Sequence, residues 1–279
     1  MVFESIRKVK PKKLYLIADG PKDKNEEVKC QDTRDIIEGK IDWECNVKKN
    51  YSDTNLGCAQ RITSGLNWVF EEEEKAIILE DDTLPNKSFF YFCEELLNKY
   101  QNDKSIYHIS GCNFHPKLCK DLEEYFITSV IHIWGWATWA NRWKNYDLEM
   151  GSWQAENKEV FLKKWCPNRR IRKETKYMFD LHCENKSPWT WDYQWVYSCW
   201  KNNGYGIIPS VNLVKNIGVG KDATNMNFNI GKEEYPAKLE EINFPINQID
   251  RKHECNITKT YLNNFSTSLI RKLINYIKN

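Results

Sequence analysis

Three adjacent carboxylates close a short apolar run in the first third of the chain. Residues Ala76–Asp82 have the sequence Ala-Ile-Ile-Leu-Glu-Asp-Asp, which is typical of a buried strand that ends in acids. Glu80, Asp81 and Asp82 repel one another and are costly to desolvate, so a cation or several hydrogen-bond donors must neutralise them at the edge of a core. Mg²⁺ and Mn²⁺ prefer oxygen ligands of this kind. The alternative is a solvated acidic turn that continues the charged run Glu71–Glu74.

A further carboxylate that could take part in catalysis lies among aromatic residues. Asp192 belongs to the run Trp-Thr-Trp-Asp-Tyr-Gln-Trp at the expected start of a helix. A single carboxylate in a partly dry pocket can act as a general base that removes a proton from a hydroxyl group. Aromatic neighbours raise the proton affinity of such an acid by desolvation, whereas a helix N-terminus favours the anion. The direction of the net change in its proton affinity therefore stays open. The alternative role for Asp192 is that of a helix N-cap.

Composition places the chain among globular proteins with a substantial core. It has 279 residues, with 41 Lys plus Arg against 39 acids, and this balance argues against a nucleic-acid partner. Twelve Trp and fourteen Tyr suit stacking on sugars and bases, although most are expected in the core. The ten cysteines form no Cys-x-x-Cys pair, which gives poor support for a zinc or redox site. Since Met1–Gly20 has no apolar region of signal-peptide length, we expect reduced thiols and a cytoplasmic location.

The first third of the sequence alternates between the two kinds of secondary structure. We expect strands over Lys13–Ala18 and Ile41–Lys48 and helices over Glu26–Glu38 and Asn55–Phe70, the last of which leads into the strand that begins at Ala76. Such alternation predicts an α/β fold of Rossmann-like type, with a mostly parallel sheet flanked by helices. Ligands of such folds bind outside the carboxyl ends of the strands.

The later elements are expected to be mostly helical, and this part carries most of the tryptophans. A helix marked by Phe89, Phe92, Leu96 and Tyr100 comes first. The remaining expectations are strands over Ile106–Ile109, Phe126–Ile133 and Gly206–Pro209, and helices over Trp134–Trp143, Lys158–Trp165, Ile171–His182 and Trp191–Trp200. The sequence contains no transmembrane span. The segment Ser266–Ile277 is expected to be a docked or surface helix, and its apolar and basic residues would allow peripheral membrane contact.

Three segments together resemble a known family. They are the Ile-Leu-Glu-Asp-Asp strand end, the block Trp134–Trp139 with the sequence Trp-Gly-Trp-Ala-Thr-Trp, and the loop Asn216–Thr224. Their order is similar to that in GT-A fold glycosyltransferases, above all bacterial family 2-like sugar transferases, and more distantly the N-acetylglucosaminyltransferase I type. The resemblance covers Leu14–Asn225. It implies a nucleotide-sugar-binding half over residues 1–133, an acceptor and catalytic-base half over 134–230, and a C-terminal extension over 231–279.

The resemblance implies a metal-dependent, inverting glycosyltransferase of hexosyl- or N-acetylhexosaminyl-transferring type. Its donor would be a nucleotide diphosphate sugar, most simply UDP-linked, and its acceptor a glycan hydroxyl. Mn²⁺ or Mg²⁺ would stabilise the diphosphate leaving group as a Lewis acid. In the family the last acid of the motif binds the metal, which falls on Asp82, while Glu80 and Asp81 orient the ribose, the donor sugar or metal-bound water. Inverting members use a Trp-flanked Asp as the base, which falls on Asp192.

Further donor-binding residues follow from the same resemblance. Asp19 and Asp53 stand where such enzymes contact the base and ribose, with a turn or cap role as the alternative. Arg61 would reach the diphosphate or the acidic motif, unless it is a solvated arginine. Trp134 and Trp136 would form an apolar wall beside a sugar, with Gly135 permitting close approach of the backbone. An ordinary core stripe is the competing explanation for these tryptophans.

One position departs from the family pattern. Many relatives have a His after Ala-Thr in the later loop as an additional metal ligand, whereas this chain has Asn225, whose amide oxygen is a weaker ligand for Mn²⁺. Metal affinity would then be low, unless His108, His115, His132 or His182 substitutes from elsewhere in the chain; a lone His is more often structural, and none of them is nominated.

Two other functions remain open at this stage. A sugar nucleotidyltransferase would share an α/β nucleotide-binding half, but the turn Asp19–Lys22 matches its Gly-rich, basic phosphate loop poorly. A non-catalytic glycan-binding protein would use the tryptophans without a metal-assisted reaction.

Overall fold

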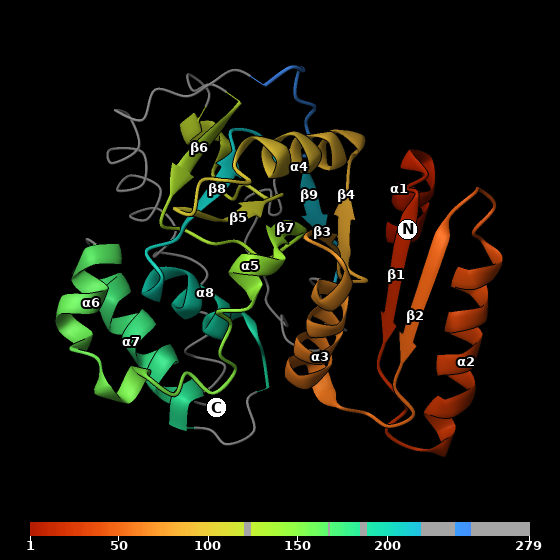
Figure 1. Ribbon diagram of the computed structural model, residues 1–279, viewed down its shortest axis with the longest axis horizontal. Helices are drawn as coiled ribbons and strands as arrows, with labels where there is room; N and C mark the ends of the chain where they lie inside the picture. Colours follow the sequence, from red (N-terminus) through yellow and green to blue (C-terminus); the bar gives the residue numbers. More distant parts are fainter. Residues whose placement is uncertain (120–123, 167, 185–188, 219–237, 247–279) are drawn as a thin grey trace.

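The chain folds as a mixed α/β protein (Figure 1). The computed structural model describes residues 1–119, 124–166, 168–184, 189–218 and 238–246. Its helices are α1 (Val2–Val9), α2 (Lys24–Gly39), α3 (Gly57–Glu72), α4 (Lys87–Lys99), α5 (Ala140–Trp143), α6 (Lys158–Trp165), α7 (Arg169–Glu184) and α8 (Asp192–Lys201). Its strands are β1 (Lys13–Ala18), β2 (Asn46–Tyr51), β3 (Lys75–Ile78), β4 (Thr83–Pro85), β5 (Ile106–Ser110), β6 (Tyr125–Thr128), β7 (Trp136–Trp139), β8 (Tyr205–Pro209) and β9 (Val214–Asn216).

The main sheet is mixed, so the expectation of a mostly parallel sheet was wrong. Its five strands have the order β3-β7-β5-β8-β6, and β5–β8 is its parallel pair, while the other three pairs are antiparallel. The alternation of strand and helix stops at β3, which is followed directly by β4, and β6 and β7 likewise follow each other without a helix between them. Regular alternation supplies the long crossovers that parallel neighbours need, so its loss leaves room for antiparallel pairs.

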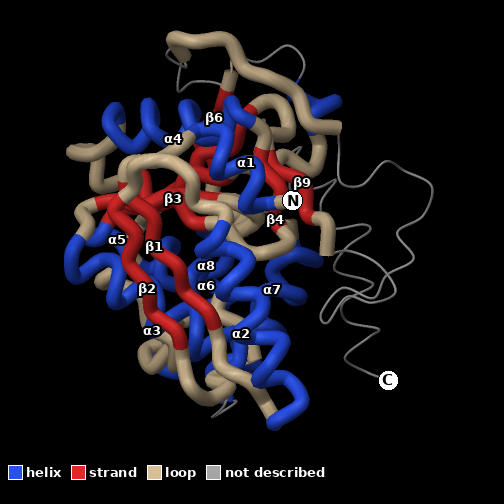
Figure 2. Tube along the Cα trace, turned by 90° about the vertical axis from the view of Figure 1, so that its right-hand side faces the viewer, coloured by secondary structure: helices blue, strands red, loops and turns tan. Residues whose placement is uncertain are grey.

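The β1–α2–β2 segment forms the predicted parallel unit. Strand β1 lies exactly where the sequence predicts it, and it pairs in parallel with β2 from Lys13 opposite Asn46 onwards. The two strands lie between α2 and α3 (Figure 2). Arg34 of α2 donates to the carbonyl oxygens of Asp19 at 3.1 Å and Ser52 at 2.9 Å, so a single guanidinium ties together the carboxyl ends of both strands. On the other face, a Cβ at Gly65 of α3 would lie 2.6 Å from the Ile17 side chain, so α3 packs directly on β1.

The tryptophan block forms a strand, so the helix predicted over Trp134–Trp143 was wrong for its first half. Trp136–Trp139 is strand β7 between β3 and β5, and only Ala140–Trp143 is helical. The spacing of Trp136, Trp139 and Trp143 fits a helical stripe, but aromatic and β-branched residues also favour a pleated surface. Pairing with the neighbouring strands β3 and β5 favours the strand over the helix for these residues.

Other element boundaries differ from expectation by a few residues. Strand β2 occupies Asn46–Tyr51 instead of Ile41–Lys48, and its basic side chains pair with flanking helices, Lys49 with Glu38 at 2.9 Å among them. Helix α1 was not predicted, because its basic residues obscured a short apolar face. Within the described ranges no helix is both long and apolar enough to cross a membrane. The segment Ser266–Ile277 lies outside those ranges.

Candidate functional site

The acidic run forms a tight turn between β3 and β4. Thr83 is fully buried, and its hydroxyl accepts from the Glu80 amide at 2.8 Å and donates to the Glu80 carbonyl at 2.9 Å. The Thr83 amide also donates to that carbonyl at 3.1 Å. Asp81 at the tip is exposed, whereas Glu80 and Asp82 are half-buried. The carboxylates are therefore held at a fixed turn and are not on a freely solvated loop.

The turn is joined to the start of the later loop that carries the family resemblance. Strands β4 and β9 are antiparallel, with Thr83 opposite Asn216. The Asn216 side-chain amide donates to Asp82 Oδ2 at 3.1 Å, and the Ile217 amide donates to the Asp82 carbonyl at 2.7 Å. A Cβ at Gly218 would lie 2.5 Å from Asp82 Oδ2, so only glycine fits here without a shift. Two of the three segments behind the resemblance therefore meet in space.

Asp192 lies close enough to the acidic turn to affect its protonation. Burial, and after it the charges of Asp82, Asp192 and Asp81, together raise the pKa of Glu80 to about 8. Burial also raises the pKa of Asp82, while the hydrogen bond from Asn216 opposes this rise. Four carboxyl groups from two distant segments thus form one acidic site. Bringing a cation there would relieve their mutual repulsion.

Asp192 is the first residue of α8, preceded by Trp191 as the N-cap. Its Oδ1 accepts from the Thr190 hydroxyl at 2.6 Å. The N-cap role considered from the sequence therefore belongs to another residue, and the Asp192 carboxylate is half-exposed beside the helix N-terminus, where a negative charge is favoured.

Tyr146 links α3 and the start of α8. Its hydroxyl donates to the Trp191 carbonyl at 3.1 Å, and its ring stacks on Trp143 with centroids 4.4 Å apart. Burial raises the pKa of Tyr146, an effect opposed by its hydrogen bond with Thr63 of α3 and reinforced by the charge of Asp192. The tyrosine therefore helps to fix the position of the residue that precedes Asp192.

Tyr146→Phe is expected to lower the free energy of unfolding by about 1–3 kcal/mol, because it removes two intramolecular hydrogen bonds, to the Trp191 carbonyl and with Thr63, and each contributes about 0.5–1.5 kcal/mol net. The Trp191 carbonyl keeps its bond from the Trp195 amide at 3.2 Å, so no buried acceptor is left unpaired. Urea unfolding followed by circular dichroism measures the change. Tyr205→Phe is the control, since Tyr205 is exposed. Equal stability of the two variants would remove the linking role of Tyr146.

The Asp19 carboxylate accepts hydrogen bonds from three backbone amides. Its Oδ1 accepts from Gly20 and Leu56, both at 2.9 Å, and its Oδ2 accepts from Gly57 at 3.0 Å. The carboxylate therefore caps α3 from the end of β1, which is the cap role considered as the alternative for Asp19. Asp53 lies exposed in the turn after β2.

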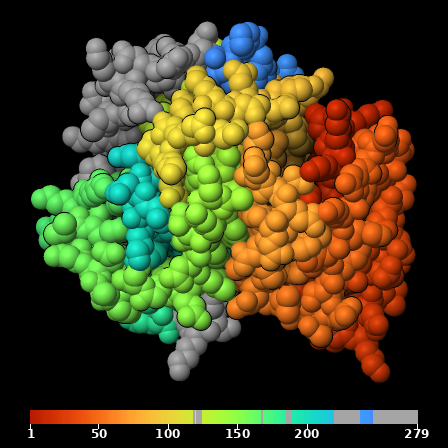
Figure 3. Space-filling view, in the orientation of Figure 1, coloured from red at the N-terminus to blue at the C-terminus, as the bar shows by residue number. Residues whose placement is uncertain are grey.

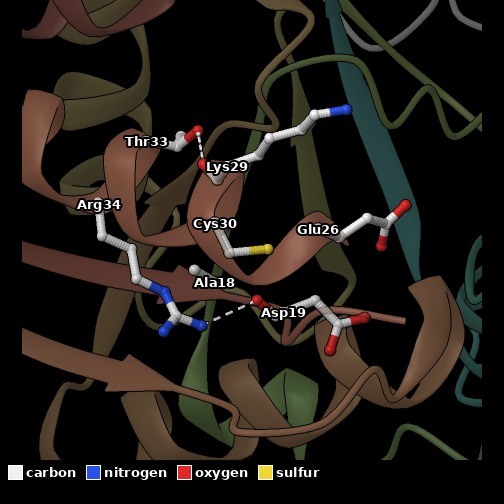
Figure 4. A pocket seen from close by; sticks show the side chains of 7 residues that line it. All are labelled: Ala18, Asp19, Glu26, Lys29, Cys30, Thr33 and Arg34. Carbon is white, nitrogen blue, oxygen red and sulfur yellow. Dashed lines mark hydrogen bonds between the residues drawn. The ribbon is translucent and has the colours of Figure 1, made fainter. Parts of the chain in front are cut away.

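Asp19 also borders a pocket at the carboxyl end of β1 (Figure 4). The pocket has a volume of about 320 Å³ and lies between β1 and α2. Its lining residues are Ala18, Asp19, Glu26, Lys29, Cys30, Thr33 and Arg34. This is the strand end at which a parallel α/β unit is expected to hold a ligand.

Arg61 is buried and holds β2 against α3. Its guanidinium is buried, and Nη2 donates to the Asn50 carbonyl at 2.6 Å and to Asn50 Oδ1 at 2.8 Å. Burial lowers the pKa of Arg61, while the charge of Asp19 opposes the change. The solvated alternative is therefore wrong, and the side chain anchors the end of β2 to α3.

Cys58 connects the two parts of the site and was missed by the sequence analysis. Desolvation of its thiol, and after it the charges of Glu80, Asp192, Asp19 and Asp81, together raise its pKa to about 12. The first turn of α3 thus lies between the end of β1 and the acidic turn. Cysteine spacing gave no signal for this, because Cys58 belongs to no motif.

The Trp-Gly-Trp residues pack into the core. Trp136 has no exposed surface, and its ring stacks on Trp191 with centroids 5.3 Å apart. Trp134 is 8% exposed and meets Phe114 edge to face. Gly135 has a φ of 62°, and a Cβ there would lie 2.8 Å from Val214. In this structure these residues offer no ring face to a sugar, so the competing core explanation describes them.

The structure describes the histidines considered as metal ligands but not Asn225. His108 and His132 are buried, and burial lowers the pKa of both. His108 accepts from the Trp195 indole at Nδ1 and bonds the His132 carbonyl through Nε2, so both ring nitrogens are in use. In the part of the chain that the structure describes, no three His, Cys, Asp or Glu side chains converge as a preformed metal cage. Asn225 lies outside that part.

The site lies between two blocks of the molecule. In the space-filling view (Figure 3), the first third of the chain forms the right-hand side and the region of α6 to α8 the left-hand side. Asp19, Cys58 and the acidic turn come from the first block and Asp192 from the second. A search against protein-family models found no match to this chain, and a search of curated proteins found none either. The case for its function therefore comes from the site itself.

Proposed function

We propose that this protein is a metal-dependent, inverting glycosyltransferase of the GT-A fold. It would transfer a sugar from a nucleotide diphosphate donor, most simply UDP-linked, to a glycan hydroxyl. The observation that carries the proposal is the approach of Asp192 to the acidic turn of Glu80, Asp81 and Asp82. A nucleotide-sugar transferase needs both a carboxylate-held cation and a separate base, and this arrangement offers candidates for each.

The acidic turn suits a divalent cation. Its oxygens are of the kind that Mg²⁺ and Mn²⁺ prefer. Burial first, and then the neighbouring carboxylates, raise the pKa of Glu80, and a bound cation would favour its ionised form. Mg²⁺ usually keeps several waters and takes one or two carboxylates together with phosphate oxygens, so a complete protein cage is not required. Asp82 would hold the ion, with Glu80 and Asp81 beside it. When bound, the ion would neutralise charge on the diphosphate leaving group.

Asp192 would perform the proton transfer. In an inverting displacement the acceptor oxygen forms a bond to the anomeric carbon as the bond to the diphosphate oxygen breaks on the opposite face. Asp192 accepts the hydroxyl proton during this step. The hydrogen bond from the Thr190 hydroxyl orients the carboxylate through Oδ1.

The pocket beside β1 supports a nucleoside site. At about 320 Å³ it falls at the lower end of the range of about 300–1,000 Å³ that is usual for small-molecule sites. Glu26, Lys29 and Arg34 supply polar groups there. Asp19, which is fully engaged with amides, would shape the loop, and Asp53 remains exposed for contact with a ribose.

The decisive experiment is a test of nucleoside diphosphate release from a panel of nucleotide sugars, with Mn²⁺, Mg²⁺ or EDTA. We expect release from one donor, loss of release with EDTA, and recovery when Mn²⁺ is restored. Pyrophosphate release would instead identify a nucleotidyltransferase. Glycan binding without binding or turnover of any donor would contradict the proposal and leave a glycan-binding protein.

A further inference from the structure

One tryptophan beside the candidate base is exposed. All twelve tryptophans lie in the described residues, and Trp189 alone of them is exposed, at 42%. It stands just ahead of Thr190 and Asp192 in the sequence, at the entrance to α8. A single exposed apolar residue is ordinary on a protein surface, so its surroundings must show whether it has a role.

The ring is supported from below by a buried aromatic stack. The Trp189 ring lies 4.4 Å from the His182 ring, centroid to centroid, and His182 in turn stacks on Tyr193 at 5.0 Å. His182 comes from α7 and is 1% exposed. This contact orients the indole and leaves its other face toward solvent. A half-exposed aromatic ring of this kind is suited to binding a ligand with an apolar side.

Two buried polar atoms next to this stack have no partner. They are His182 Nε2 and Gln194 Oε1, and Gln194 has no exposed surface. The Gln194 amide nitrogen donates to the Thr190 carbonyl at 2.9 Å and faces His182 Nδ1 at 3.5 Å. His182 Nδ1 is therefore the acceptor, and in the neutral ring the proton lies on Nε2. One donor and one acceptor remain unsatisfied, each of which costs stability when buried.

We propose that Trp189, His182 and Gln194 form the acceptor subsite and bind a pyranose ring. The C–H face of the sugar would stack on the indole. Its hydroxyls, each both donor and acceptor, would pair with His182 Nε2 and Gln194 Oε1. Both atoms are closed off from solvent, so this pairing requires the exposed Trp189 ring to shift, a motion that surface side chains undergo in picoseconds to nanoseconds.

The neighbouring charges favour a neutral sugar over a nucleotide at this position. Asp192 follows Trp189 by three residues and is half-exposed, so its carboxylate would repel a phosphate group there, whereas a neutral sugar hydroxyl could donate to it. A hydroxyl of a pyranose stacked on Trp189 would lie on the Asp192 side of the site. The identification of this sugar as the acceptor rests on the proposed function, whereas its binding to Trp189 does not.

Saturation-transfer NMR with methyl glycosides of glucose, galactose, mannose and N-acetylglucosamine tests the subsite, with and without UDP and Mn²⁺. At least one glycoside should bind the natural protein. Trp189→Ala should weaken that binding about 5- to 10-fold, in line with the strength of aromatic contacts. Trp189→Phe should retain most of it, and Tyr91→Ala, which removes an aromatic residue of similar exposure on α4, should leave it unchanged.

Failure of the subsite and failure of the proposed function have different signatures. Binding of UDP with Mn²⁺, measured by calorimetry, should be the same in the natural protein and in Trp189→Ala. Glycoside binding that is absent, or equal in the two proteins, overturns the subsite even where the donor is turned over. Glycoside binding that depends on Trp189, in a protein that binds none of the nucleotide sugars of the panel with Mn²⁺, supports the subsite and removes the transferase proposal.

Discussion

Asp192→Asn is expected to lower the rate of sugar transfer about 10²- to 10⁴-fold, the usual contribution of a general base. The amide has the shape of the carboxylate but cannot take up the acceptor proton. Its oxygen still accepts the hydrogen bond that the Thr190 hydroxyl makes at 2.6 Å, so the start of α8 should keep its conformation. The effect should appear in kcat, while donor affinity changes little.

Single-turnover transfer and calorimetric donor binding separate these two quantities. Glu94→Gln is the matched control, since Glu94 is an exposed acid on α4 and loses its charge in the same way. Transfer that survives Asp192→Asn would exclude this residue as the base. Loss of donor binding with an unchanged rate at saturation would instead place Asp192 in the donor site.

The first third of the fold was predictable because its signals are local. Strand β1, helix α2 and helix α3 follow from apolar periodicity and turn residues. The structure confirms that β1 and β2 are parallel, with α2 connecting them. The sheet order was not predictable in this way. Strand β7 lies between β3 and β5, and nothing in Trp136–Trp139 itself specifies these partners. Pairing is a tertiary property that overrides a four-residue pattern.

The candidate site shows the same division. The sequence identified Glu80, Asp82 and Asp192 as acids at the ends of elements, but their proximity depends on how α8 packs beside the sheet. Asp19 was placed correctly at the end of β1, whereas its bonds to the amides of Leu56 and Gly57 join residues far apart in the chain. Burial of the tryptophan block likewise required knowledge of β9, since Val214 packs against Gly135.

Asp82→Ala is expected to weaken the binding of Mn²⁺ and of the nucleotide donor together, by about 100-fold or more. Even second-shell partners of a metal typically contribute about 10- to 100-fold in affinity, and Asp82 is the proposed direct ligand. The local fold should survive, because the Ile217 amide bonds the backbone carbonyl of Asp82 at 2.7 Å and not its side chain. Calorimetry with Mn²⁺ alone, and then with UDP and Mn²⁺, measures both affinities.

Asn216→Ala is the matched control, because it removes the 3.1 Å hydrogen bond to Asp82 but keeps the carboxylate. It should weaken metal binding much less than Asp82→Ala does. Stability provides a second distinction, since the charge of Asp82 contributes to the raised pKa of Glu80. Asp82→Ala and Asn216→Ala both lose the hydrogen bond between these side chains, but only Asp82→Ala also relieves repulsion, so in the absence of metal it should unfold at a higher urea concentration than Asn216→Ala. Lower stability of Asp82→Ala than of Asn216→Ala, together with intact Mn²⁺ affinity, would make Asp82 a structural residue.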